Sequence, residues 1–511
     1  MNLLLNGKEL ALYILKSLIE KGMQDVFLCP GSRNASFTFA LEGLEELNCY
    51  THYEERSCAF FALGNAKKTK KPAAVIVTSG TAAGELYPAV MEAYYSRMPL
   101  VLITADRPKR YRGTGAPQAA EQKGMFGSYA FALDIETISD FNLIGWDGIS
   151  PLHLNVCLED PNAKAKPFLE DNKKEGFQDF LKSTEFPLVI VGTLEKEKQA
   201  EAIDLLLQLN CPVILESSSN LREEEALQHL HIRGTAKLLQ WAKKANYPVD
   251  AVIRIGGVPT LRFWRDLEEL PIKVCSISKL PFTGSPKGFL LQEDLSSLLL
   301  KVEKSSLFFQ KAKMWLQKDQ AYQNRLQQLI IQEPKSSPAM LYQLSKILPD
   351  NSLLYLGNSL SIRDWDLAAC IENKNFTVFA SKGLNGIDGQ LSTFFGLCSE
   401  VKENFAILGD LTALYDMAAP WMLPQMAGIS VTVFVVNNQG GKIFSRLFKP
   451  AIFQNNHELN FKPFAEFWGM EYEVWEQVPD KLEKSCKNRL VEIRPCNLAR
   501  DRLLDNLLTL D

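Results

Sequence analysis

Apolar runs alternate with amphipathic stretches along most of the chain. The runs that we interpret as strands are residues 25–29, 73–78, 100–104, 187–192, 250–256, 406–408 and 432–436. They are short and mostly aliphatic, which is typical of strands buried on both faces of a sheet. Amphipathic stretches between such strands indicate helices that cover parallel sheets. The pattern therefore predicts an α/β fold of doubly wound parallel sheets.

Two polar segments interrupt this pattern. Residues 160–176 are rich in Lys, Asn, Asp and Pro, and residues 332–338 have a similar composition. Such composition suits linkers between domains. A chain of 511 residues is also too long for one hydrophobic core. We therefore expect a first domain over residues 1–165, a central domain over 177–331 and a third domain over 339–511.

The composition and charge of the chain limit the classes of function that it can have. A formal net charge of −4 gives no reason to expect nucleic acid or an anionic membrane as a partner. The apolar run at 431–436 is far too short to span a membrane, and residues 1–8 lack the layout of a secretory signal. The ten cysteines form no C-x-x-C pair, and the five histidines form no ligand-spaced cluster. We expect a cytoplasmic protein with reduced thiols, which takes its chemistry from a cofactor.

A candidate metal site lies in the last third of the chain. Asp410 follows the predicted strand at 406–408, and Asn438 follows the one at 432–436. If these strands are neighbours in a parallel sheet, their carboxyl ends lie at the same edge. Oxygen ligands of this kind suit Mg²⁺. The glycines after Asn438 let the backbone approach, so the carbonyl of Gly440 is a candidate third ligand. Either piece alone would be interpreted as a simple turn.

Together the two pieces resemble the signature of thiamine-diphosphate enzymes, G-D-x followed at some distance by N-N. The third position, usually Gly, is Leu411 here. Further segments resemble one family closely, the 2-succinyl-5-enolpyruvyl-6-hydroxy-3-cyclohexene-1-carboxylate synthases of menaquinone biosynthesis, called the synthase family below. These segments are PGSRN (30–34), EERS (54–57), ALGNAK (62–67), residues 78–108, GNSLSIR (357–363), NGIDGQLST (385–393), GDLTALYD (409–416) and VVNNQGGKIF (435–444).

The resemblance implies three domains of the thiamine-diphosphate-enzyme type, with thiamine diphosphate and Mg²⁺ (or Mn²⁺) as cofactors. Glu55 matches the catalytic carboxylate that shares a proton with the aminopyrimidine ring, whereas we expect Glu54 to be a solvated carboxylate at a helix start. Ile387 matches the apolar residue that holds the cofactor in its bent shape. Ile443 and Phe444 would lie beside the diphosphate. The residues implied at the diphosphate and metal are Gly409, Asp410, Leu411, Asn438, Gly440 and Gly441.

The resemblance also implies the substrates 2-oxoglutarate and isochorismate. The first would lose CO₂, and its succinyl carbanion would add to isochorismate by 1,4-addition. Arginine suits the carboxylates of these acids because its planar fork binds them bidentately. The positions that match substrate residues of the family are Ser32, Arg33, Arg107, Gln118, Arg262, Ser359, Arg363 and Lys382. The i, i+4 spacing of Ser359 and Arg363 predicts that both lie on one face of a helix. Family members are generally homodimers or homotetramers.

Two positions depart from the family pattern. The family usually has Asn before Gln118, where this chain has Pro117, and a family arginine is Lys382 here. Lysine keeps the charge but loses the fork, so the change bears on the substrates rather than on the cofactor. Another thiamine-diphosphate-dependent decarboxylase or carboligase is the alternative function. A catalytically silent protein of the same fold would be expected to lack Glu55, Asp410 or Asn438.

Overall fold

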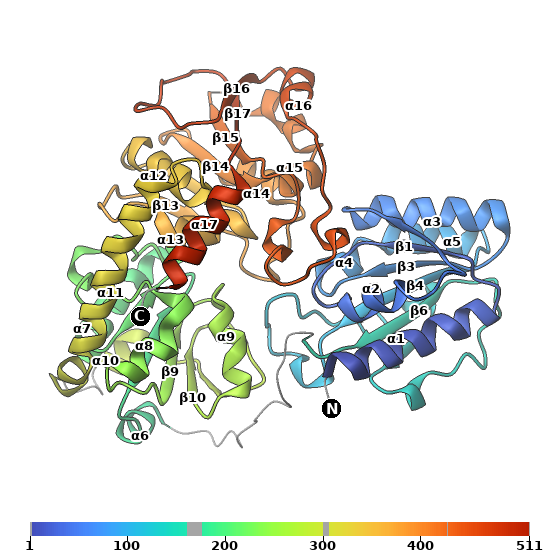
Figure 1. Ribbon diagram of the computed structural model, residues 1–511, viewed down its shortest axis with the longest axis horizontal. Coiled ribbons are helices and arrows are strands. Elements are labelled where there is room, and N and C mark those ends of the chain that lie inside the picture. Colours follow the sequence, from blue (N-terminus) through green and yellow to red (C-terminus); the bar gives the residue numbers. More distant parts are fainter. Residues whose placement is uncertain (1–2, 161–175, 300–305, 427, 510–511) are drawn as a thin grey trace. The chain divides into compact units, whose positions relative to one another are not determined.

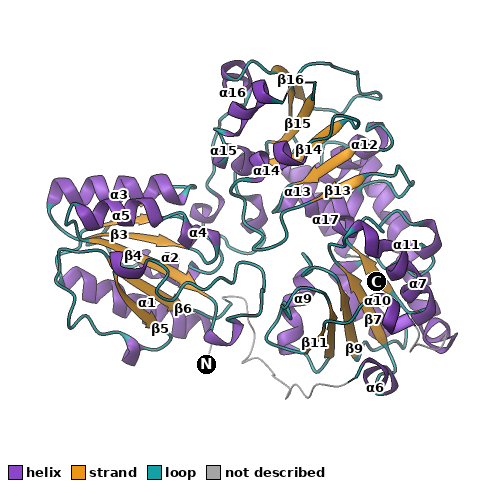
Figure 2. Cartoon of the chain, turned by 180° about the vertical axis from the view of Figure 1, so that it is seen from behind, coloured by secondary structure: helices purple, strands orange, loops and turns teal. Residues whose placement is uncertain are grey.

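The computed structural model of the protein describes residues 3–160, 176–299, 306–426 and 428–509. It contains three β-sheets flanked by helices (Figures 1 and 2). The predicted α/β class with three parallel sheets is therefore confirmed. The chain forms two compact units, of which the first holds the first sheet with residues 384–386 and 440–457, and the second holds the other two sheets. The proposed domain boundaries stay a prediction, and most of the first polar segment, residues 161–175, lies outside the described residues.

The first sheet has the strand order β2-β1-β3-β4-β6-β5, and every neighbouring pair is parallel. One face is covered by α1 and α2 and the other by α3 and α5, with a separate apolar core on each side. The strands are β1 (Asp25–Leu28), β2 (Asn48–Thr51), β3 (Ala73–Val77), β4 (Leu100–Asp106), β5 (Phe131–Ile135) and β6 (Leu152–Cys157), and the helices are α1 (Leu3–Glu20), α2 (Ala35–Leu41), α3 (Glu55–Thr69), α4 (Thr81–Gly84) and α5 (Tyr87–Tyr95).

The central sheet has the order β11-β10-β9-β7-β8 and is also parallel. Helices α6, α7 and α10 pack on one face, and α8, α9 and α11 on the other. The strands are β7 (Pro187–Val191), β8 (Val213–Leu215), β9 (Ala251–Ile255), β10 (Lys273–Ile277) and β11 (Phe289–Leu291), and the helices are α6 (Phe177–Lys182), α7 (Gln199–Leu209), α8 (Leu238–Lys244), α9 (Arg262–Asp266), α10 (Leu295–Leu299) and α11 (Ser306–Gln332).

The third sheet has the order β13-β12-β14-β15-β17-β16. Numbered from its own first strand, this is the order of the first sheet. In both sheets the winding reverses between the first and third strands, which in open parallel sheets marks the ligand crevice. The strands are β12 (Leu353–Leu356), β13 (Thr377–Phe379), β14 (Asn404–Gly409), β15 (Val431–Val436), β16 (Glu471–Trp475) and β17 (Arg489–Ile493), and the helices are α12 (Ser337–Ile347), α13 (Leu360–Ala368), α14 (Gln390–Leu397), α15 (Asp410–Tyr415), α16 (Lys462–Phe467) and α17 (Asn497–Leu508).

None of the helices in the described ranges is long and apolar enough to cross a membrane.

Candidate functional site

Asp410 and Asn438 lie at the same edge of the third sheet. Strands β14 and β15 are neighbours, and Gly409 is the register partner of Val436 at their carboxyl ends. Asp410 starts α15 directly after β14, and its carboxylate accepts a hydrogen bond from Leu411 N at 2.7 Å. The Oδ1 atom of Asn438 is buried and has no hydrogen-bond partner among the described residues. A buried oxygen of this kind, beside a carboxylate, fits a cation with oxygen ligands.

Residues that the sequence analysis missed hold the turn after β15 in place. Glu492 on β17 is fully buried, and its carboxylate accepts hydrogen bonds from Asn437 Nδ2 at 3.0 Å and from the Tyr472 hydroxyl at 2.6 Å. On the other side, Asn497 Nδ2 donates to the carbonyl of Asn438 at 2.9 Å. A lone acidic residue within the apolar strand β17 is the sequence signal that could have revealed Glu492.

The glycines after this turn belong to the first compact unit. Gly440 has φ +127°, and a Cβ there would lie 2.4 Å from the carbonyl oxygen of Gln454. Only glycine fits this position, because any other residue would be strained by the positive φ and its Cβ would clash with the carbonyl oxygen. Gly441 N donates to the same carbonyl at 2.5 Å. Ile443 and Phe444, which follow, are half-buried.

Glu55 is the first residue of α3 and only 8% of it is exposed. Its neighbour Glu54 caps the helix, accepting from Arg56 N at 3.1 Å and Ser57 N at 2.9 Å. The expectation that Glu54 is solvated is wrong: it is 7% exposed, because a capping carboxylate folds over the free amides of the first turn. Burial, together with hydrogen bonding and the nearby charge of Glu55, raises the pKa of Cys29, which follows β1. Glu55 therefore lies near the carboxyl end of β1.

Two predicted arginines of the first unit follow the carboxyl ends of strands. Arg33 lies in the turn after β1, is buried, and donates from an Nη to the carbonyl of Leu158 at 2.8 Å. Arg107 follows β4 and donates from Nε and Nη2 to the carbonyl of Pro117 at 3.0 and 2.7 Å. Its guanidinium also lies 4.9 Å from the ring centroid of Tyr111. Both side chains are held in fixed orientations.

Two other predicted residues lie near these strands. Ser32 precedes Arg33 in the same turn and is half-buried. Gln118 has a positive φ of 53°, and its backbone N–H donates to the carbonyl of Leu384 at 2.8 Å. The first unit therefore brings Gln118 beside the segment 384–386, although the two are far apart in sequence.

A second group of predicted residues gathers after β12. Ser359 is the residue before α13 and has a φ of 73°, so the prediction that it shares a helix face with Arg363 is wrong in detail. The two are nevertheless in contact, because Arg363 Nη1 donates to the Ser359 carbonyl at 2.6 Å. Lys382 donates to Asn358 Oδ1 at 3.1 Å. Ser359, Arg363 and Lys382 therefore lie around one strand end. Ile387, five residues after Lys382, is half-buried.

Two carboxylates, the buried Glu216 and the half-buried Asp366, were also missed by the sequence analysis and influence these cations. Burial lowers the pKa of Lys382 to about 8; the charges of Glu216 and Asp366 oppose this shift and that of Arg363 adds to it. Burial and the charge of Asp366 raise the pKa of Glu216. Asp366 accepts hydrogen bonds from the N and Oγ of Ser217 at 2.9 and 2.5 Å. Glu216 directly follows the apolar strand β8, a position at which an acidic residue is a signal for a site.

Arg262 is not among the predicted residues that gather after β12. Its Nε donates to Asp266 Oδ1 at 2.7 Å, four residues along α9, and its side chain is 40% exposed. The preceding residues Thr260 and Leu261 donate backbone N–H groups to Glu216 Oε1 at 2.5 and 3.3 Å. Glu216 thus links the segment before Arg262 to the group that contains Lys382.

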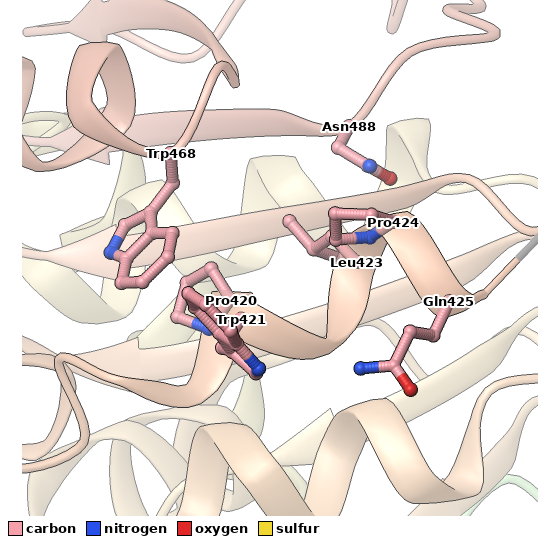
Figure 3. A pocket seen from close by; sticks show the side chains of 7 residues that line it. All are labelled: Pro420, Trp421, Leu423, Pro424, Gln425, Trp468 and Asn488. Carbon is pink, nitrogen blue, oxygen red and sulfur yellow. The ribbon is translucent and has the colours of Figure 1, made fainter.

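A surface pocket of about 450 Å³ lies elsewhere, between the segment 420–425 and residues next to α16 and β17 (Figure 3). Its lining comprises Pro420, Trp421, Leu423, Pro424, Gln425, Trp468 and Asn488. Figure 3 shows the two tryptophans and Pro420 near one another and the amides of Gln425 and Asn488 away from them. None of these residues is charged, and none is a predicted site residue. This pocket is therefore not the candidate site.

Comparisons with known proteins agree with the resemblance. Residues 8–125 match the family described as "Thiamine pyrophosphate enzyme, N-terminal TPP binding domain". A 2-succinyl-5-enolpyruvyl-6-hydroxy-3-cyclohexene-1-carboxylate synthase from Bdellovibrio bacteriovorus is 37% identical, over 96% of this chain and 97% of that protein. The synthase of the same name from Akkermansia muciniphila is also 37% identical, over 93% of each. The one from Bacillus velezensis is 30% identical, over 95% of this chain and 94% of that protein.

Proposed function

Because this chain belongs to the 2-succinyl-5-enolpyruvyl-6-hydroxy-3-cyclohexene-1-carboxylate synthase family, we propose that it catalyses the reaction for which that family is named. It decarboxylates 2-oxoglutarate and adds the succinyl unit to isochorismate by 1,4-addition, with release of CO₂, in menaquinone biosynthesis. The observation that carries the proposal is 37% identity over almost the full length of both chains. The proposal is also supported by Asp410 and Asn438, which lie after the carboxyl ends of two neighbouring strands.

Thiamine diphosphate is the cofactor, as the match of residues 8–125 indicates. When bound, it supplies a thiazolium carbanion and an electron sink for the decarboxylation. We propose that Asp410, Asn438 and the carbonyl of Gly440 hold Mg²⁺ or Mn²⁺ beside its diphosphate. The buried Oδ1 of Asn438, which has no partner in the described chain, supports this assignment. Gly409, Leu411 and Gly441 flank these ligands in the sequence and would contact the diphosphate.

Glu55 is the proposed catalytic carboxylate. It would hold the proton of an aminopyrimidine nitrogen, and its burial would keep water from competing for that proton. Ile387, Ile443 and Phe444 would form apolar walls that exclude water from the reacting carbon. These positions follow the family pattern residue by residue.

Cationic and polar side chains would bind the substrates. Arg33, Arg107, Arg363 and Lys382 would bind carboxylates, because each carries a positive charge at a strand end. The neutral groups Ser32, Gln118 and Ser359 would orient the substrates, and Arg262 would add a further charge from the central sheet. Substrate-binding residues on several loops of rigid sheets hold two reactants in a fixed relative geometry.

The remaining proposals concern assembly and location. We propose a homodimer or homotetramer with sites at the subunit interface, because in the family one chain's first domain and its partner's third domain hold opposite ends of the cofactor. Sedimentation velocity measures this directly. The ten cysteines all lie among the described residues, none of them is in a disulfide, and six are buried, which supports a reducing compartment such as the cytoplasm. The domain boundaries at residues 165, 177, 331 and 339 remain part of the proposal.

An omission assay tests the function. Isochorismate loss is followed by absorbance with Mg²⁺, thiamine diphosphate and 2-oxoglutarate, each left out in turn. We expect consumption only with all components, and a fall in kcat of at least about 100-fold in Glu55→Gln. Glu54→Gln is the matched control: its amide oxygen can still accept one of the two capping bonds, so the variant should lose some stability but keep its kcat within about threefold. Cofactor binding without any isochorismate loss would refute the proposed reaction.

A further inference from the structure

The side-chain amide of Asn385 lacks hydrogen-bond partners for both of its polar atoms among the described residues. Its Oδ1 and Nδ2 atoms are buried, and neither has a hydrogen-bond partner among the residues that the structure describes. Its backbone has a φ of 61°, a left-handed conformation that asparagine tolerates better than most residues. Buried donors and acceptors are normally satisfied, because leaving them unmet costs free energy. A carboxamide whose donor and acceptor both lack a partner therefore points to a ligand that has both an acceptor and a donor.

The surroundings of Asn385 are proposed substrate residues. The preceding carbonyl, that of Leu384, accepts the backbone N–H of Gln118 at 2.8 Å. Gly80 packs so closely under Gln118 that a Cβ on it would lie 3.0 Å from the Gln118 Cα. The carbonyl of Pro117 is bonded to the guanidinium of Arg107. The carboxamide of Asn385 is thus attached to a segment that is fixed beside Pro117 and Gln118.

We propose that the carboxamide of Asn385 binds isochorismate and supplies a side-chain amide in place of the Asn that the family usually has at position 117. This inference rests on the proposed function. Pro117 has no side-chain donor or acceptor, so this chain needs an amide from another segment. The Nδ2 of Asn385 would donate to a carboxylate of isochorismate, and its Oδ1 would accept from the ring hydroxyl. Because 2-oxoglutarate has no hydroxyl group, the contact favours the second substrate over the first.

Asn385→Gly removes the carboxamide without straining the positive φ. We expect the KM for isochorismate to rise by about 10- to 100-fold, as for a lost hydrogen bond to a charged group, and the KM for 2-oxoglutarate to stay within about twofold. Adding Pro117→Asn to this variant should recover about tenfold of the loss by restoring the family's amide. The matched control is Asn246→Gly, an exposed asparagine with a φ of 55° at the end of α8, for which both KM values should be unchanged.

The outcomes separate the inference from the proposed function. If the wild-type protein consumes isochorismate and Asn385→Gly leaves its KM unchanged, the inference is overturned and the function stands. Equal increases in the KM of both substrates, or no recovery by Pro117→Asn, would also overturn it, since they indicate a structural role. If the wild-type protein does not consume isochorismate, the proposed function itself is wrong.

Discussion

We predict that Lys382 gives this enzyme a pH dependence that an arginine at the same position would not give. Burial lowers the pKa of Lys382 to about 8, whereas arginine stays protonated throughout the accessible range. At pH 7 about nine-tenths of the Lys382 side chains are charged, and at pH 9 about one-tenth are. The direction of the pH effect follows from these fractions, because the cation that would bind a substrate carboxylate is present below pH 8 and is lost above it.

The expected magnitude follows from these fractions. If only the charged form binds a carboxylate, the KM of that substrate rises about tenfold from pH 7 to pH 9 in the wild-type protein. Lys382→Arg should remove this rise, because the guanidinium stays charged and regains the fork that the family uses. Glu216→Gln should move the rise to lower pH, since the charge of Glu216 favours the protonated form of Lys382.

Initial rates measured from pH 6.5 to 9.5, with each substrate varied in turn, test this account. The reasoning is refuted if the wild-type and Lys382→Arg profiles rise in parallel for both substrates. It is also refuted if Glu216→Gln leaves the midpoint unchanged.

Two further changes probe the turn after β15. In Glu492→Gln an amide NH₂ faces groups that donate hydrogen bonds to the wild-type carboxylate, Asn437 among them. We therefore expect the free energy of unfolding, measured in urea, to fall by about 2–4 kcal/mol. We also expect thiamine diphosphate with Mg²⁺ to bind about tenfold more weakly, as measured by calorimetry. Unchanged binding in a folded variant would show that Glu492 does not position the turn. Gly440→Ala meets the Gln454 carbonyl and a positive φ, and should weaken cofactor binding by more than tenfold, a loss above about 1.4 kcal/mol. Gly469→Ala has a positive φ but open space, so it should cost only about 1 kcal/mol of stability and leave binding intact.

The sequence predicted the parallel sheets because their strands are short, apolar and separated by amphipathic helices. It also predicted the sheet edge at which Asp410 and Asn438 lie, since each comes within two residues of the end of such a strand and parallel neighbours end together. Both inferences depend only on local pattern and on the geometry of parallel sheets, which explains why they succeeded.

Contacts between segments that are far apart in the sequence could not be predicted from local pattern. The partners of Glu492 include Tyr472 and Asn437, which are 20 and 55 positions away, and no local period reveals them. The pairing of Arg262 with Asp266 was open to a helical spacing argument, but the sequence does not tell whether a charge faces solvent or substrate. Glu54 was misjudged because glutamate is not among the preferred capping residues, so its burial as a cap was not expected.

The most direct test of the central claim is the stoichiometry of the reaction. Release of labelled CO₂ from 2-oxoglutarate and loss of isochorismate are measured in the same reaction with thiamine diphosphate and Mg²⁺. We predict one CO₂ released for each isochorismate consumed, with neither process proceeding at a comparable rate when the other substrate is absent. Rapid CO₂ release without isochorismate loss would contradict the claim and identify the enzyme as a different thiamine-diphosphate-dependent decarboxylase or carboligase.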